Sequence, residues 1–123
     1  MKKTALVFML LAAVVFLAGC TSSPAAGQEV AQDTIRAHYE HHGDWSTGLG
    51  CFDKVSGYAY NAGNASVDNV VLNFNLVNIQ SGTIRDSRSV FIGTLGAGLS
   101  RTFETELNGE CTQDYRVDGT IRQ

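Results

Sequence analysis

The sequence predicts an all-β domain behind an N-terminal export signal. From residue 34 onward, apolar and polar residues alternate in short runs that are separated by glycine-rich turns. A period of two residues is typical of strands with one buried face. No run of helical period lies between them, which excludes a parallel α/β arrangement. Before this region, an apolar run over residues 5–18 follows a basic N-terminus, which is the pattern of an export signal.

The apolar run ends at a cysteine. Lys2 and Lys3 precede it, and it is shorter than the roughly 20 residues that a membrane-spanning helix needs. It ends in "LAGC", residues 17–20, which resembles the lipobox of prokaryotic lipoproteins. The resemblance implies that residues 1–19 are a signal peptide and that Cys20 receives a diacylglyceryl group and becomes the N-terminus. The alternative is a plain secretory signal with a chance cysteine.

The lipobox resemblance also implies a location. The protein would be exported and held on the membrane by lipid, because two acyl chains anchor a protein stably. In a two-membrane bacterium, Thr21 behind the cysteine resembles the class that is sorted to the outer membrane. In other hosts the protein would lie on the outer face of the cytoplasmic membrane. Residues 20–32, which include "TSSPAAGQ", predict a flexible tether to a domain of residues 33–123.

Six runs of strand period are expected in this domain. In the clearest run, residues 69–78, one set of side chains would face the core, and the Asn-bearing set, which includes Val77, would face solvent or an edge. The inward set is Val70, Leu72, Phe74 and Leu76. The other runs are residues 34–42, 51–61, 84–93, 100–107 and 114–121. A short helix from Glu29 is the alternative for the first of these. This spacing predicts an antiparallel sandwich of the immunoglobulin-like kind with six or seven strands.

Residues 55–78 also resemble the FxLYD domain of prokaryotic exported proteins and lipoproteins. In that family a V-x-G-x-x-x-N strand leads through a short turn to an N-V strand that ends in F-x-L-Y-D. The matching residues here are Val55, Gly57, Asn61, Asn69, Val70, Phe74 and Leu76. Val77 and Asn78 stand where the family has Tyr-Asp. The resemblance implies an immunoglobulin-like surface module without an established enzymatic role.

The three cysteines of the chain predict one disulfide. If Cys20 carries the lipid, Cys51 and Cys111 are left as a pair, and a bridge between them can persist outside the cytoplasm. Two free, buried thiols are the alternative. Metal binding by these two residues alone is disfavoured, because a structural zinc site needs four ligands.

The tract "HYEHHGD", residues 38–44, is the candidate for a metal site. On a strand, His38, Glu40 and His42 would share one face and offer three ligands to zinc or another transition metal. The alternative is a solvated polar face at the rim of the first strand.

Two further features are expected at the surface. Asn64 begins an Asn-Ala-Ser sequon in a predicted turn, which matters only in a host that glycosylates such sites. Tyr58 and Tyr60 would lie on the outer face of their strand. There they would form either an interaction patch or cross-strand packing.

Charge and motifs together bound the function. A net charge of −3 gives no footprint for nucleic acid. No nucleophile elbow or phosphate-binding glycine loop occurs in the sequence, so neither an enzyme nor a cofactor is expected. We therefore expect a cell-envelope surface lipoprotein whose sandwich is a non-catalytic binding or structural module for an unidentified envelope protein or ligand. A metal-binding envelope protein that uses His38, Glu40 and His42 is the alternative.

Overall fold

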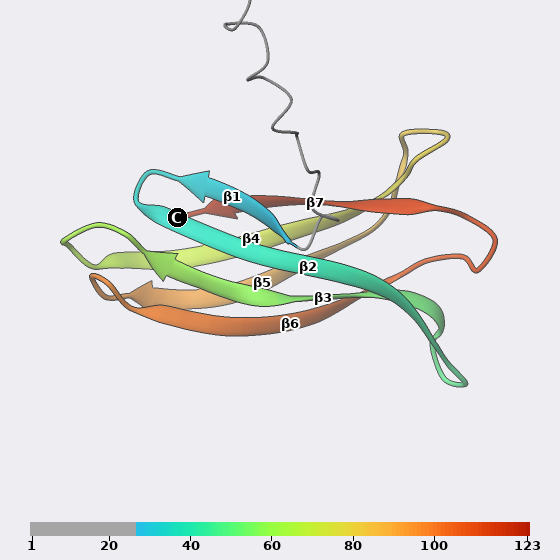
Figure 1. Ribbon diagram of the computed structural model, residues 1–123, viewed down its shortest axis with the longest axis horizontal. Coiled ribbons are helices and arrows are strands. Elements are labelled where there is room, and N and C mark those ends of the chain that lie inside the picture. Colours follow the sequence, from blue (N-terminus) through green and yellow to red (C-terminus); the bar gives the residue numbers. More distant parts are fainter. Residues whose placement is uncertain (1–26) are drawn as a thin grey trace, which may run out of the picture.

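The computed structural model describes residues 27–123. In this part the regular elements are seven strands joined by turns. Two antiparallel sheets face each other as the layers of a sandwich (Figure 1). The strands are β1 (Gln28–Gln32), β2 (Ile35–Ser46), β3 (Gly50–Asn61), β4 (Val67–Asn78), β5 (Ile84–Leu95), β6 (Ser100–Asn108) and β7 (Tyr115–Arg122). The predicted all-β sandwich is confirmed. Within residues 27–123, no helix is long and apolar enough to cross a membrane.

The two sheets have the strand orders β1-β2-β3-β6 (sheet A) and β5-β4-β7 (sheet B). This is a four-and-three division like that of constant-type immunoglobulin domains, but with different neighbours in each sheet. Hairpins join β1 to β2, β2 to β3 and β4 to β5, and the three other connections cross between the sheets. At the long sides of the sandwich, β1 lies beside β7 and β5 beside β6 (Figure 1). Each open sheet edge is therefore partly covered by the opposite sheet.

Strand β1 corrects the predicted start of the domain. The sequence pattern assigned residues 28–32 to the tether, whereas they pair with β2 from Gln28 opposite Tyr39 to Gln32 opposite Ile35. The segment has one partly buried apolar residue, Val30, so it gives almost no periodic signal. It is an edge strand that backbone pairing holds in place. The strand prediction for residues 34–42 is confirmed by β2, and the helical alternative from Glu29 is wrong.

The core lies between the sheets and is built around Phe74. The ring of Phe74 packs edge-on against Tyr39, with centroids 5.0 Å apart, and stacks on Phe103 at 5.4 Å. All four residues that were predicted to point inward from residues 69–78 are buried. Val77 is buried too, although alternation placed it outward. The register shift between Leu76 and Val77 leaves Arg85 of β5 without a partner on β4, whereas β4 pairs with β7 without interruption there. β4 is the middle strand of sheet B, so β5 and β7 flank Val77 on its two sides.

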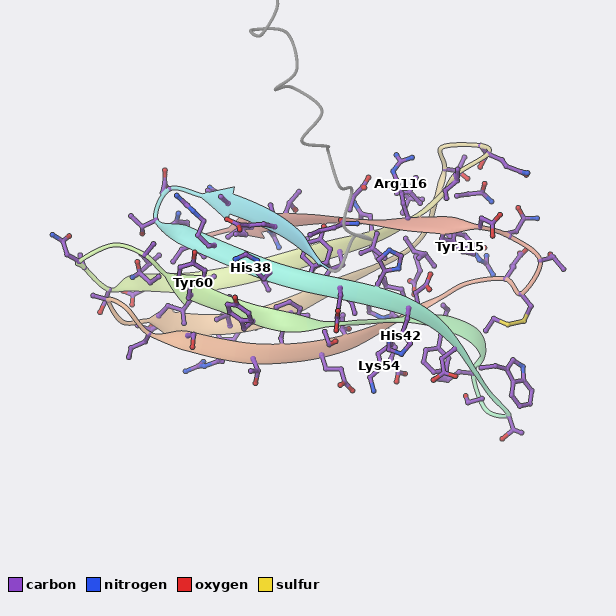
Figure 2. All side chains as sticks on the ribbon, viewed as in Figure 1. His38, His42, Lys54, Tyr60, Tyr115 and Arg116 are labelled. Atoms are coloured by element: carbon purple, nitrogen blue, oxygen red, sulfur yellow. A yellow bond between two sulfur atoms is a disulfide. The ribbon has the colours of Figure 1, made fainter. Side chains whose placement is uncertain are left out.

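Cys51 and Cys111 form a disulfide with their Cα atoms 5.2 Å apart. The predicted pairing is therefore present, and the alternative of two free thiols is wrong. The bridge ties the start of β3 in sheet A to the β6–β7 crossover, which leads into sheet B. Figure 2 shows it as the yellow bond at one end of the sandwich. We call this end, where β2 ends and β7 begins, the disulfide end.

Candidate functional site

The three residues of the predicted metal site lie along β2 without meeting. Figure 2 shows His38 and His42 well apart on the same strand. Residues four apart on an antiparallel strand are separated by about 13 Å, whereas two zinc ligands at about 2.0–2.1 Å from the metal lie within about 4 Å of each other. No group of three or more His, Cys, Asp or Glu residues that could hold a metal ion occurs in residues 27–123. His38, Glu40 and His42 share a face, as predicted, but residues 27–123 do not bring them together as three ligands of one metal ion.

His38 instead joins the two predicted surface tyrosines. Its ring stacks on Tyr58, with centroids 5.2 Å apart, and on Tyr60 at 6.0 Å. Its Nε2 lies 2.9 Å from a carboxylate oxygen of Glu29 on β1. The tyrosines thus lie on the outer face of sheet A, packed across the strands as in the second of the two predicted arrangements. Asn64 is exposed in the β3–β4 connection, and Cys20 lies outside the described residues.

A cleft that the sequence analysis did not predict lies at the disulfide end. Its volume is about 450 Å³, which is within the range of small-molecule sites. The end of β2, the start of β3 and the β6–β7 connection line it. Its aromatic side chains are Trp45, Phe52 and Tyr115, and its carboxylates are Asp44, Asp53 and Glu110. Among the described residues that line it, none is a lysine or an arginine. We call it the acidic aromatic cleft.

The aromatic side of the cleft is fixed by strand pairing and by the disulfide. Trp45 of β2 pairs with Cys51 of β3 across the β2–β3 hairpin, so the indole lies on the strand next to the one that carries the bridge. The N–H of Gly109 donates to the carbonyl oxygen of Cys51 at 3.1 Å. The N–H of Glu110 donates to the hydroxyl oxygen of Tyr115 at 2.9 Å. The first bond holds the crossover against the hairpin, and the second holds it against the start of β7. The walls of the cleft are therefore set before any ligand arrives.

The carboxylate of Asp53 is the most buried acid of the cleft. Its side chain is 13% exposed, and this burial raises the pKa of Asp53 although the nearby His41 and His42 act to lower it. The Nδ1 atom of His41 lies 3.9 Å from the carboxylate, which is beyond hydrogen-bond distance. Within the described residues this buried nitrogen has no hydrogen-bond partner. Asp53 is thus a largely buried acid whose neighbouring basic groups are the two histidines His41 and His42.

The tract "GDW", residues 43–45, is the feature of the sequence that could have pointed to this cleft. It places the single tryptophan of the chain next to an acid in a polar segment. Its connection to the segment around Cys111 could be inferred only through the disulfide. No family model, no curated protein and no solved structure matches this chain, so the resemblance to the FxLYD domain stays a prediction.

Proposed function

We propose that the chain is a non-catalytic binding protein of the cell envelope that is held on the membrane by lipid on Cys20 and binds its ligand in the acidic aromatic cleft. One observation carries the binding role. The single tryptophan of the chain, Trp45, is 60% exposed and lines a cleft of suitable size. Tryptophan is enriched among the residues that dominate binding energies.

The rigidity of the cleft supports the same proposal. A disulfide, a hairpin, one backbone hydrogen bond and one hydrogen bond to a tyrosine hydroxyl fix its walls. Binding to a preorganised site avoids much of the entropy cost of ordering loops and side chains.

The position of β1 is compatible with attachment at Cys20. The described chain enters sheet A at Gln28, which pairs with Tyr39 near the middle of β2. Trp45 lies six residues further along the same strand, about 20 Å away. A tether of residues 20–27 would reach at most about 29 Å when fully extended. A protein anchored in this way would stand close to the membrane with the cleft at a distance from the point of attachment.

Membrane fractionation tests the anchor. The wild-type chain should partition into the detergent phase, and a Cys20→Ala variant should not. Equal membrane retention of the two proteins would contradict lipid attachment at this residue.

Tryptophan fluorescence tests the binding site, because every photon from an indole of this chain comes from Trp45. Size-separated fractions of the native envelope should include one that shifts the emission to shorter wavelength in a saturable way. Calorimetry with that fraction should show binding that is lost in Trp45→Ala and kept in Phe91→Ala. Phe91 is the matched control, since it is 71% exposed on β5 and does not line the cleft. Equal loss in both variants, or no active fraction, would refute the cleft as the binding site.

A further inference from the structure

We propose that the acidic aromatic cleft takes an organic cation, an alkylammonium or guanidinium group, and seats it between the indole of Trp45 and the surrounding carboxylates. This inference rests on the proposed function, because it names the ligand class of the same cleft. It is drawn from the charge of the lining residues and from the kind of aromatic surface beside them.

The charge of the cleft selects against anions. Asp44, Asp53 and Glu110 line it, and no lysine or arginine among the described residues does so. The Oδ1 of Asp44 accepts the backbone N–H of Trp45 at 2.8 Å, which fixes this carboxylate at the end of β2. An anionic ligand would meet these carboxylates at close range, whereas a cation would neutralise them.

The three carboxylates differ in how free they are to receive a cation. Glu110 lies 3.6 Å from Arg85, and both side chains are about half exposed, so this surface pair is weak and exchangeable. Asp53 is mostly buried, with His41 at 3.9 Å and His42 as its nearby basic groups. A cation that reaches Asp53 would compensate a carboxylate that burial now disfavours. Of the three carboxylates, Asp53 should therefore contribute most to the free energy of binding a cation.

The aromatic residues favour a cation over a neutral ligand. Tryptophan provides the best face for a cation–π contact, and aromatic cages with acids are the common sites for alkylated ammonium groups. Trp45 exposes its ring at the mouth of the cleft, and Phe52 and Tyr115 also line the cleft. A neutral sugar would use the aromatic surface but would gain nothing from the buried carboxylate. Acid and aromatic groups in one cleft together indicate a cation.

The test compares a charged ligand with its neutral isostere on the detergent-solubilised full chain. Nα-acetyl-lysine methylamide carries an alkylammonium group, and its Nε-acetylated form does not. The charged compound should change Trp45 emission saturably, and the neutral one should bind about ten-fold more weakly or not at all. Binding of the charged compound should also weaken as salt is raised. A hexalysine peptide distinguishes the source of the cation, since tighter binding of the peptide points to a basic protein segment and equal binding to a small molecule.

Two variants locate the effect in the cleft. Asp53→Asn should weaken binding of the charged compound about ten-fold. Asp68→Asn is the matched control and should leave binding unchanged, because it removes the same charge at the far end of β4, where Asp68 accepts a hydrogen bond from Thr94. Equal affinity for the charged and neutral compounds, or no effect of Asp53→Asn, would overturn the inference. If a neutral envelope component still shifts Trp45 emission, the cation inference fails while the proposed function stands; if nothing binds at Trp45, both fail.

Discussion

Removal of the disulfide should strongly destabilise the domain and loosen its acidic aromatic cleft. Cys51 and Cys111 are separated by 60 positions in the sequence. Closing a loop of this length removes enough entropy from the unfolded chain to stabilise the folded state by about 4 kcal/mol. For a domain of roughly 100 residues, each kcal/mol shifts the melting temperature by about 4–8 °C. The Cys51→Ser/Cys111→Ser variant should therefore melt about 15–30 °C below the oxidised protein.

Calorimetry of three samples measures this effect: the oxidised protein, the reduced protein and the double serine variant. The reduced protein and the variant should melt at nearly the same temperature, because both lack the same constraint. Trp45 emission should shift to longer wavelength in both, since its strand partner Cys51 is released from the crossover. Thiol titration in a Cys20→Ala background, after unfolding without reductant, should find no free thiol. Two free thiols, or a loss below about 5 °C, would refute the reasoning.

Three other substitutions test the fold and the electrostatics. Gly57→Ala should lower the free energy of unfolding by about 2–4 kcal/mol, because a Cβ there would collide with a backbone carbonyl of β2; Gly48→Ala, which meets nothing within 4 Å, is the control in urea denaturation. Tyr39→Phe should cost about 1–3 kcal/mol in the same assay, because the N–H of Gly119 loses the hydroxyl that accepts it at 3.0 Å. Burial raises the pKa of Asp53, so its contribution to stability is greatest below its ordinary pKa of about 3.9 and is lost as pH rises through the folded-state pKa. The stability of Asp53→Asn relative to wild type should therefore increase from acid to neutral pH, as measured by thermal melts at several pH values. If the difference in melting temperature between the two proteins does not change with pH, the raised pKa is contradicted.

Alternation along single strands explains why most of the core could be predicted. Val70, Leu72 and Phe74 follow the pleat of β4 and are buried as expected. The same reasoning failed for Val77, because alternation assigns a side chain to a face but does not say how far the neighbouring strands, here β5 and β7, cover that face. It failed for β1, because an edge strand with one apolar residue depends on backbone pairing rather than on a buried face.

The cleft could not be predicted because its parts are distant in the sequence. Trp45 and Tyr115 come from different sheets and from opposite ends of the domain sequence. Strand periodicity says which side of a strand a residue occupies but not which strands become neighbours. The same limitation produced the metal hypothesis, since a shared face on β2 does not bring His38 and His42 together. Of all the sequence features, only the cysteine pair linked the two halves of the cleft.

The two ends of the sandwich are closed in different ways. At the end opposite the disulfide, the fully buried Asn61 donates to the carbonyl oxygens of Ala65 and Leu95 at 2.7 and 3.0 Å. Its own amide oxygen accepts the N–H of Gly63 at 2.9 Å. One side chain thus joins β3, the β3–β4 connection and β5, and fills the space between them. Such a network stabilises the fold only when every polar group in it is satisfied, so it leaves no group free for a ligand.

At the disulfide end a covalent bond joins neighbouring segments, as the hydrogen bonds of Asn61 do at the opposite end. A bridge between Cys51 and Cys111 joins hairpin and crossover without filling the space beside them. The bridge therefore supplies stability that Asp53 and Trp45, which line this space, need not supply through their own contacts. For that reason the domain can be stable although the largely buried carboxylate of Asp53 lines an open cleft. Reduction of the disulfide should therefore weaken ligand binding and lower the stability of the fold together. Substitutions around Asn61 should lower the stability of the fold and leave ligand binding unchanged.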